Sequence, residues 1–187
     1  MSRLMDSLEW DHANLTRLLD TLERQVAVFD EARLPDYDII RAIVEYCLTY
    51  PDTVHHPKED LVFRKLRDRD PTAAARVGDL EGAHATLAVQ TQRMASAVDA
   101  VLQDAAMSRA TFDGLVRDFL AAYREHIAME ESQFFPAARA ALTAADWAEL
   151  DAAAGGPNDP LFGDSVEARF KPLMDQVFAH HNANPNA

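Results

Sequence analysis

Residues 50–63 read YPDTVHHPKEDLVF and place His55 and Glu59 four residues apart. Side chains at positions i and i+4 of an α-helix lie on the same face. Apolar residues continue this face at helical spacing, so we expect it to be buried in a helical core. Pro51 and Pro57 each remove a backbone hydrogen bond, and they therefore predict a kink or a local bulge at this point.

The rest of the chain also indicates an all-α protein. It contains only 6 glycines in 187 residues, many alanines and leucines, and no alternating β-branched runs. Four long helices are predicted, at about residues 4–29, 36–69, 71–107 and 108–140. Asp70 with Pro71, and Ser108, are typical residues for the starts of the third and fourth helices. Because the connections are short, the pattern predicts an up-down-up-down four-helix bundle.

A short helical extension is expected after the bundle. Thr143 and Asp146 form the pattern of a capping box for a fifth helix, which Gly155-Gly156-Pro157 would end. A last amphipathic segment should pack on the bundle through Phe162, Val166, Phe170, Leu173 and Val177. The tail NANPNA is expected to be disordered. We therefore divide the chain into a bundle, residues 1–140, and a C-terminal extension, residues 141–187.

The charge and composition exclude several classes of partner. The formal net charge of −13 argues against nucleic acid or an anionic membrane surface. The N-terminal residues lack the apolar core of a signal peptide, and no apolar run approaches the roughly 20 residues of a membrane span. We expect a cytoplasmic protein. Cys47 is the single cysteine, so an internal disulfide and a cysteine-rich zinc site are excluded.

Each predicted helix carries a histidine within its apolar stripe: His12, His55, His84 and His126. Glu130 follows His126 by four residues, as Glu59 follows His55. His12 and His55 lie roughly 21 and 22 residues from the turn expected near residue 33, so they should stand at the same height in the bundle. His84 and His126 match less closely, with a height difference of roughly 6 Å. The four histidines and two glutamates are thus expected to meet in one buried layer.

Such a layer is costly unless it binds something. Carboxylates buried in an apolar core need compensating charge, and unpaired polar groups there cost several kcal/mol. A pair of divalent metal ions would supply that charge. Nitrogen and oxygen donors without thiolate suit iron or manganese better than structural zinc.

These residues resemble the hemerythrin-like (HHE cation-binding) family over about residues 4–140. The resemblance rests on His12, the HxxxE pair His55/Glu59, the lone His84 and the second HxxxE pair His126/Glu130, with a phenylalanine eight residues after the histidine of each pair. It implies a non-haem di-iron centre in a four-helix bundle, with the two glutamates bridging and the four histidines as terminal ligands. The implied cofactor is two iron ions joined by an oxo or hydroxo bridge, with manganese or zinc as alternative metals. Family members bind or respond to O2, NO or peroxide, or handle iron.

Two features depart from the oxygen-carrying members of that family. Leu80 and Ala88 stand where a second histidine would lie one turn from His84, and the final carboxylate would be Glu131 rather than Glu130. The departures favour redox, sensing or iron-handling chemistry over reversible oxygen carriage. His56 is an alternative ligand, but its position about 100° round the helix from His55 predicts a place in solvent or behind the ligands.

Several interpretations stay open at this point. Glu131 is expected to be exposed or behind the ligands, and His180 and His181 are expected at the surface. Tyr50 and Tyr123 should lie near the layer, either packing or hydrogen-bonding a bound oxygen species. The rival functions are a di-iron enzyme that decomposes peroxide or oxidises a substrate, and a structural bundle without metal. A small diatomic or peroxide ligand is expected, and a protein partner or a homodimer is left open.

Overall fold

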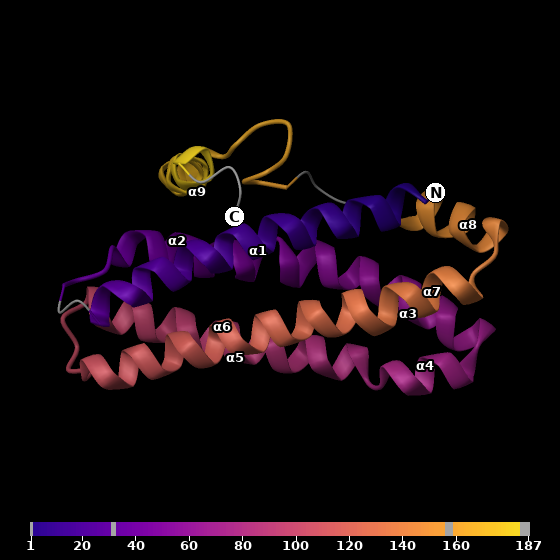
Figure 1. Cartoon of the computed structure of the whole chain (residues 1–187), viewed down its shortest axis with the longest axis horizontal. Helices are drawn as coiled ribbons and strands as arrows, with labels where there is room; N and C mark the ends of the chain where they lie inside the picture. The colour runs from indigo at the N-terminus through magenta and orange to yellow at the C-terminus, as the bar shows by residue number, and fades with distance from the viewer. Residues whose placement is uncertain (1, 31–32, 156–158, 184–187) are drawn as a thin grey trace.

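The computed structural model describes residues 2–30, 33–155 and 159–183, with side chains for all of these except 29, 30 and 180–183. Within these ranges the chain is helical and has no strand, as the sequence predicts. Four antiparallel arms run along the long axis of the molecule (Figure 1). None of the described helices is both long and apolar enough to cross a membrane.

The four arms differ in how far they stay regular. They comprise α1 (Arg3–Asp30); α2 (Tyr37–Thr49), the π-helical turn η1 (Pro51–His55) and α3 (His56–Arg69); α4 (Pro71–Val77) and α5 (Leu80–Leu102); and α6 (Arg109–Met129), the π-helical turn η2 (Glu130–Phe134) and α7 (Phe135–Ala141). Helix α1 contacts α2 and α6, and α5 contacts the same two helices. Each arm therefore packs against two neighbours, which is the arrangement of an up-down-up-down bundle.

The third arm is interrupted, which the sequence pattern did not predict. Gly78 ends α4 with φ +94°, a conformation that side-chain-bearing residues rarely adopt. Asp79 then caps α5 by accepting a hydrogen bond from the backbone N–H of Gly82. The predicted single helix from 71 to 107 is therefore two helices, and the second ends at Leu102.

The core is divided into two apolar clusters by a polar layer. The small cluster includes Leu8, Val62, Leu80 and Phe134, and the large cluster includes Leu15, Val54, Leu87 and Ile127. In every arm the boundary between the clusters falls at a predicted layer residue. The layer is thus a single cross-section of the bundle with apolar packing on both sides.

The C-terminal extension packs on the bundle at two places. Helix α8 (Ala144–Ala153) begins with the predicted capping box of Thr143 and Asp146 and contacts α1 and α3. The 3₁₀ turn η3 (Ala168–Phe170) and α9 (Lys171–Ala183) follow, and α9 lies against α1 and α2 (Figure 1). The predicted contact residues Phe170, Leu173 and Val177 are buried, and Phe162 and Val166 are partly buried.

The structure also bears on the predicted tail. Helix α9 continues to Ala183, so the first two residues of NANPNA are helical rather than disordered. Residues 184–187, and the side chains of His180 and His181, lie outside the described residues.

Candidate metal centre

All six predicted site residues meet in the polar layer. His12 comes from α1, His55 from the end of η1, Glu59 from α3, His84 from α5, His126 from α6 and Glu130 from the start of η2. His12, Glu59 and Glu130 are completely buried, and His126, the most accessible of the six, has 8% of its side chain exposed. The ring centroids of His12 and His55 are 5.1 Å apart, and those of His84 and His126 are 4.9 Å apart. The predicted height mismatch of the second pair is absent because the turn comes earlier than expected. Helix α5 ends at Leu102 and α6 begins at Arg109, so His84 lies 18 residues before the turn and His126 lies 17 residues after it.

Glu59 faces histidines on two sides. Its Oε1 lies 3.3 Å from His12 Nε2 and 3.4 Å from His55 Nε2. Its Oε2 lies 3.4 Å from His84 Nε2. The carboxylate therefore stands between the histidines of α1 and η1 and the histidine of α5.

Glu130 repeats this arrangement from the opposite arm. Its Oε2 lies 3.3 Å from His12 Nε2, and its Oε1 lies 3.2 Å from His84 Nε2 and 3.1 Å from His126 Nε2. The layer thus has two halves, each receiving one oxygen from each glutamate. The first half contains His12 and His55, and the second contains His84 and His126.

His56 lies beside the second half and is buried, so the expectation that it points to solvent is wrong. The alternative, that it lies behind the ligands, stays a prediction. His56 is 4% exposed and stacks on His84 with ring centroids 4.4 Å apart. Potential donor atoms of His56, Glu59, His84 and His126 all lie within 4.8 Å of one another, as do those of His12, His55 and Glu59. The reason is that η1 and α3 lie between two neighbouring arms, so adjacent positions turned about 100° apart both face inward, one toward each neighbour.

Four carboxylates hold the outer nitrogens of the histidines, and sequence reasoning missed three of them. Their closest contacts with Nδ1 are 3.3 Å for His12–Glu131, 3.1 Å for His55–Asp11, 3.3 Å for His56–Asp52 and 2.8 Å for His84–Asp60. Three of these contacts, those of His12, His55 and His84, are hydrogen bonds. Since an ionised carboxylate only accepts, the Nδ1 of these three histidines carries the proton and Nε2 is turned toward the layer. Asp11 directly precedes His12 in the sequence but contacts His55 of the second arm. Glu131 directly follows Glu130 but contacts His12 of the first arm. Their role therefore depends on helix packing that the sequence alone does not give.

Two π turns aim these side chains, and each ends two residues before a proline. In η1 the N–H of His55 bonds to Tyr50 O, and the N–H of His56 bonds to Pro51 O. In η2 the N–H of Phe135 bonds to Glu130 O. Pro57 and Pro136 lack the N–H that would continue a regular α-helix, and the wider i→i−5 turn accommodates this loss. The bulge predicted from Pro51 and Pro57 is confirmed, whereas the one before Pro136 was not predicted.

The layer is strongly coupled electrostatically. Burial alone lowers the pKa of His12, but the hydrogen bonds and charges of Glu130 and Glu59 outweigh it and raise this pKa to about 10. Burial also lowers the pKa of His84, but its hydrogen bonds to Asp60, Glu130 and Glu59 outweigh this effect and raise the pKa to about 11. Burial raises the pKa of Glu59, but the charge of His55 and the hydrogen bonds to His12 and His84 lower it to about 2. Without metal, protonated His12 and His84 therefore face the ionised carboxylates of Glu59 and Glu130.

Several atoms of the layer are left without hydrogen bonds. Of the seven buried side-chain atoms without a hydrogen-bond partner among the described residues, five belong to the layer: His12 Nε2, Glu59 Oε1, Glu59 Oε2, His126 Nε2 and Glu130 Oε2. Their neighbours are 3.1–3.4 Å away but are not oriented for a hydrogen bond. Two donors about 2.1 Å from one metal ion and at right angles to each other would lie about 3.0 Å apart. The donor set and its spacing therefore fit metal ions better than an internal hydrogen-bond network.

The tyrosines near the layer lie behind it. Tyr50 Oη is 3.4 Å from both carboxylate oxygens of Asp11, which in turn contacts His55. Tyr123 Oη lies 3.4 Å from Thr91 Oγ1 within the large apolar cluster. Cys47 is fully buried in that cluster, and burial raises the pKa of its thiol to about 12.

A family model described as "Hemerythrin HHE cation binding domain" matches residues 3–138. The matched range contains all the histidines and glutamates of the layer and ends before α8. No curated protein and no solved structure matches the chain.

Proposed function

The chain belongs to the hemerythrin HHE cation-binding family, and we propose that its layer holds two iron ions side by side. The observation that carries the proposal is that Glu59 and Glu130 each direct one oxygen at each half of the layer. A carboxylate in that position contributes a ligand to two neighbouring cations and offsets part of the charge of both.

The two proposed positions have different donor sets. The first would be held by His12 and His55 with Glu59 Oε1 and Glu130 Oε2. The second would be held by His56, His84 and His126 with the other two oxygens. His56 would thus supply the nitrogen donor that oxygen-carrying members of the family have one turn from the position of His84. It is suited to this role because burial lowers its pKa and keeps the imidazole neutral at pH 7.

Iron is proposed from the chemistry of the donors. Imidazole nitrogens with carboxylate oxygens, and no thiolate, suit iron and manganese, and zinc accepts the same donors. The buried carboxylates carry the compensating charge, the Nδ1 hydrogen bonds fix the rings of His12, His55 and His84, and the two apolar clusters exclude water. Such an iron pair would bind, or exchange electrons with, small molecules such as O2, NO or peroxide.

The rival functions differ in measurable ways. A structural bundle without metal is disfavoured by the five buried atoms that lack hydrogen bonds, since an internal network would satisfy them. An enzyme that decomposes peroxide would share the same layer and would be distinguished by turnover.

The test is the metal content and optical spectrum of protein purified from iron-supplemented cells under air. We expect about two irons per chain, one for each half of the layer, with ligand-to-iron absorption in the near ultraviolet. A folded protein that stays metal-free after anaerobic incubation with ferrous iron would refute the proposal. Assaying peroxide consumption by the loaded protein then separates an enzyme from a binding protein.

A further inference from the structure

The two halves of the layer are not equally close to solvent. His12 and His55 are at most 1% exposed, whereas His84 and His126 have 7% and 8% of their side chains exposed. The second half is therefore the side from which an ion reaches the layer with the least rearrangement.

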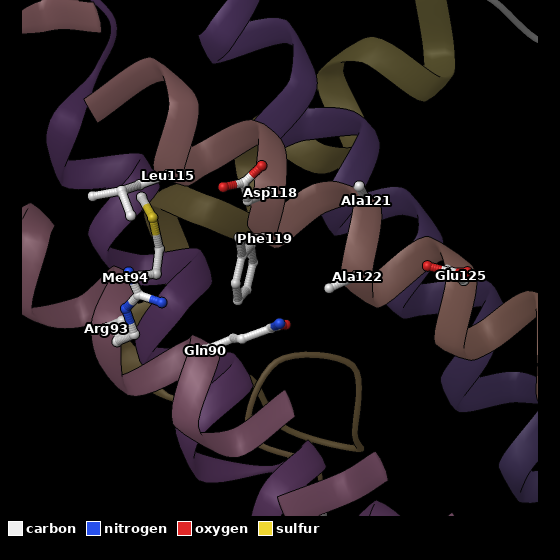
Figure 2. A pocket seen from close by; sticks show the side chains of 9 residues that line it. All are labelled: Gln90, Arg93, Met94, Leu115, Asp118, Phe119, Ala121, Ala122 and Glu125. Atoms are coloured by element: carbon white, nitrogen blue, oxygen red, sulfur yellow. The ribbon is translucent and has the colours of Figure 1, made fainter. Parts of the chain in front are cut away.

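Two adjoining hollows between α5 and α6 lead to this side. The outer hollow, with a volume of about 340 Å³, runs past Gln90, Asp118, Phe119 and Ala122 and is shown in Figure 2. The inner hollow, so called because it lies nearer the layer, opens directly to solvent, has a volume of about 610 Å³, and shares Gln90, Ala122 and Glu125 with the outer one. It is also lined by His126. Short side chains dominate the rest of its wall: Ala83, Thr86, Ala128 and Ser132.

His126 is the side chain that separates the inner hollow from the layer. It lines the hollow, and its Nε2 lies 3.1 Å from Glu130 Oε1. The other four histidines of the layer each have a carboxylate oxygen within 3.3 Å of Nδ1. The described residues place no carboxylate against the Nδ1 of His126. Its ring is therefore the least restrained of the five and can rotate about its side-chain bonds without losing a contact between Nδ1 and a carboxylate.

The charge around the route favours a cation. The layer and its Nδ1 partners together contain six carboxylates: Glu59, Glu130, Asp11, Asp52, Asp60 and Glu131. Glu125, exposed and shared by both hollows, adds another on the way in. Arg93 adds a positive charge to the wall of the outer hollow, so the negative potential that concentrates cations belongs to the inner hollow and to the layer beside it.

We propose that the groove between α5 and α6 is the access route by which divalent metal ions load the layer, with His126 as its movable inner gate. The inference rests on the proposed function, because it assumes that the layer binds metal. It assigns to Ala122, which lines both hollows and is not part of the layer, control of the rate of loading.

The experiment compares ferrous iron uptake by two variants of the metal-free protein under anaerobic conditions. Ala122→Trp places an indole where the hollows meet. Ala95→Trp is the control, since Ala95 is a similarly half-buried alanine that lines a different hollow, between α2 and α5, which includes no layer residue. The time course is followed by trapping free iron with a chromogenic chelator, and the final iron content is measured by elemental analysis.

We expect Ala122→Trp to load roughly tenfold more slowly, because the ion must then wait for a local opening of the helices. Its final iron content should equal that of the wild type, and Ala95→Trp should load at the wild-type rate. Equal rates in Ala122→Trp and wild type would overturn the route while leaving the metal site intact. A wild-type protein that takes up no iron would instead refute the proposed function and the route with it. If Ala122→Trp does not fold, Thr86→Trp, at an exposed position on the wall of the inner hollow, is read in the same way.

Discussion

Removing one glutamate of the layer should cost more metal than removing one histidine. Glu59 faces both halves, so Glu59→Ala removes a donor from each proposed position. His84 is placed in the second half alone, so His84→Ala removes a donor from one position. The loss of a residue that only hydrogen-bonds to a metal ligand commonly weakens metal binding by about 10–100-fold. We take this factor as a lower bound for the loss of a ligand itself.

The expected metal content follows from that bound. At a free metal concentration about tenfold above the wild-type Kd, the two wild-type positions together hold about 1.8 ions per chain. If both positions weaken by about 10–100-fold, Glu59→Ala holds about 0.2–1.0 ions. If one position weakens by the same factor, His84→Ala holds about 1.0–1.4 ions. Glu130→Ala should behave like Glu59→Ala because Glu130 also faces both halves.

The assay is equilibrium dialysis against a metal buffer followed by elemental analysis, with helicity monitored by circular dichroism. Glu149→Ala is the matched control, because Glu149 is exposed and, within the part of the chain that the structure describes, forms an ion pair only with Lys65. The isosteric Glu59→Gln tests whether the loss follows the charge rather than the cavity. The reasoning is refuted if Glu59→Ala keeps two ions, or if it loses no more metal than His84→Ala.

Four further predictions concern proton release, the pH dependence of stability, a thiol and the extension. At pH 7, metal binding should release about two protons, one each from His12 and His84. Their pKa values of about 10 and about 11 lie above that pH, and both imidazoles must lose the Nε2 proton to coordinate a metal ion. The release is measured with a pH indicator in weakly buffered solution, and zero release contradicts the prediction. In the metal-free protein the same raised pKa values contribute stability that is complete below the ordinary value of 6.5 and is lost as the pH rises toward 10–11, so the urea midpoint should fall between pH 6 and pH 10. Cys47 should resist a thiol reagent at pH 8 until the protein unfolds, because its thiol is fully buried and its pKa is raised. Rapid labelling of the native protein would show that the large cluster opens more readily than its packing indicates. Tyr46→Phe removes the 2.8 Å hydrogen bond from Tyr46 Oη to buried Asp159. It should lower the free energy of unfolding, measured by chemical denaturation, by about 1–3 kcal/mol. A change near zero would mean that Asp159 finds another partner.

The sequence predicted the layer because its signal is repeated in every arm. A single buried histidine is common in ordinary cores, but four histidines at matching distances from successive turns indicated one cross-section of a bundle. The capping box at Thr143 and the apolar contacts of α9 were also predicted, since each depends on a local pattern of a few residues.

What the sequence did not predict depends on irregular backbone and on packing between arms. The helix was expected to continue through Gly78 because the residues on both sides favour helix, and the Gly78–Asp79 pair was not recognised as a stop followed by a cap. The expected solvent exposure of His56 was wrong because a helical wheel considers one neighbour, whereas this arm faces both α1 and α5. The Nδ1 partners such as Asp11 were missed because they act on a histidine of a different helix.

The polar layer has a consequence for the fold that is separate from metal binding. In the first arm Leu8 lies in the small cluster, His12 in the layer and Leu15 in the large cluster, and the other arms follow the same order or its reverse. Sliding one arm by a single turn, about 5.4 Å, would bring leucines opposite Glu59 and Glu130 and bury a histidine among apolar side chains. An uncompensated buried charge costs several kcal/mol, so every slipped register is penalised whether or not metal is present. A uniformly apolar core of leucines and valines would not make that distinction. The residues proposed to hold the metal pair therefore also select the one alignment of the four arms in which the pair can be held.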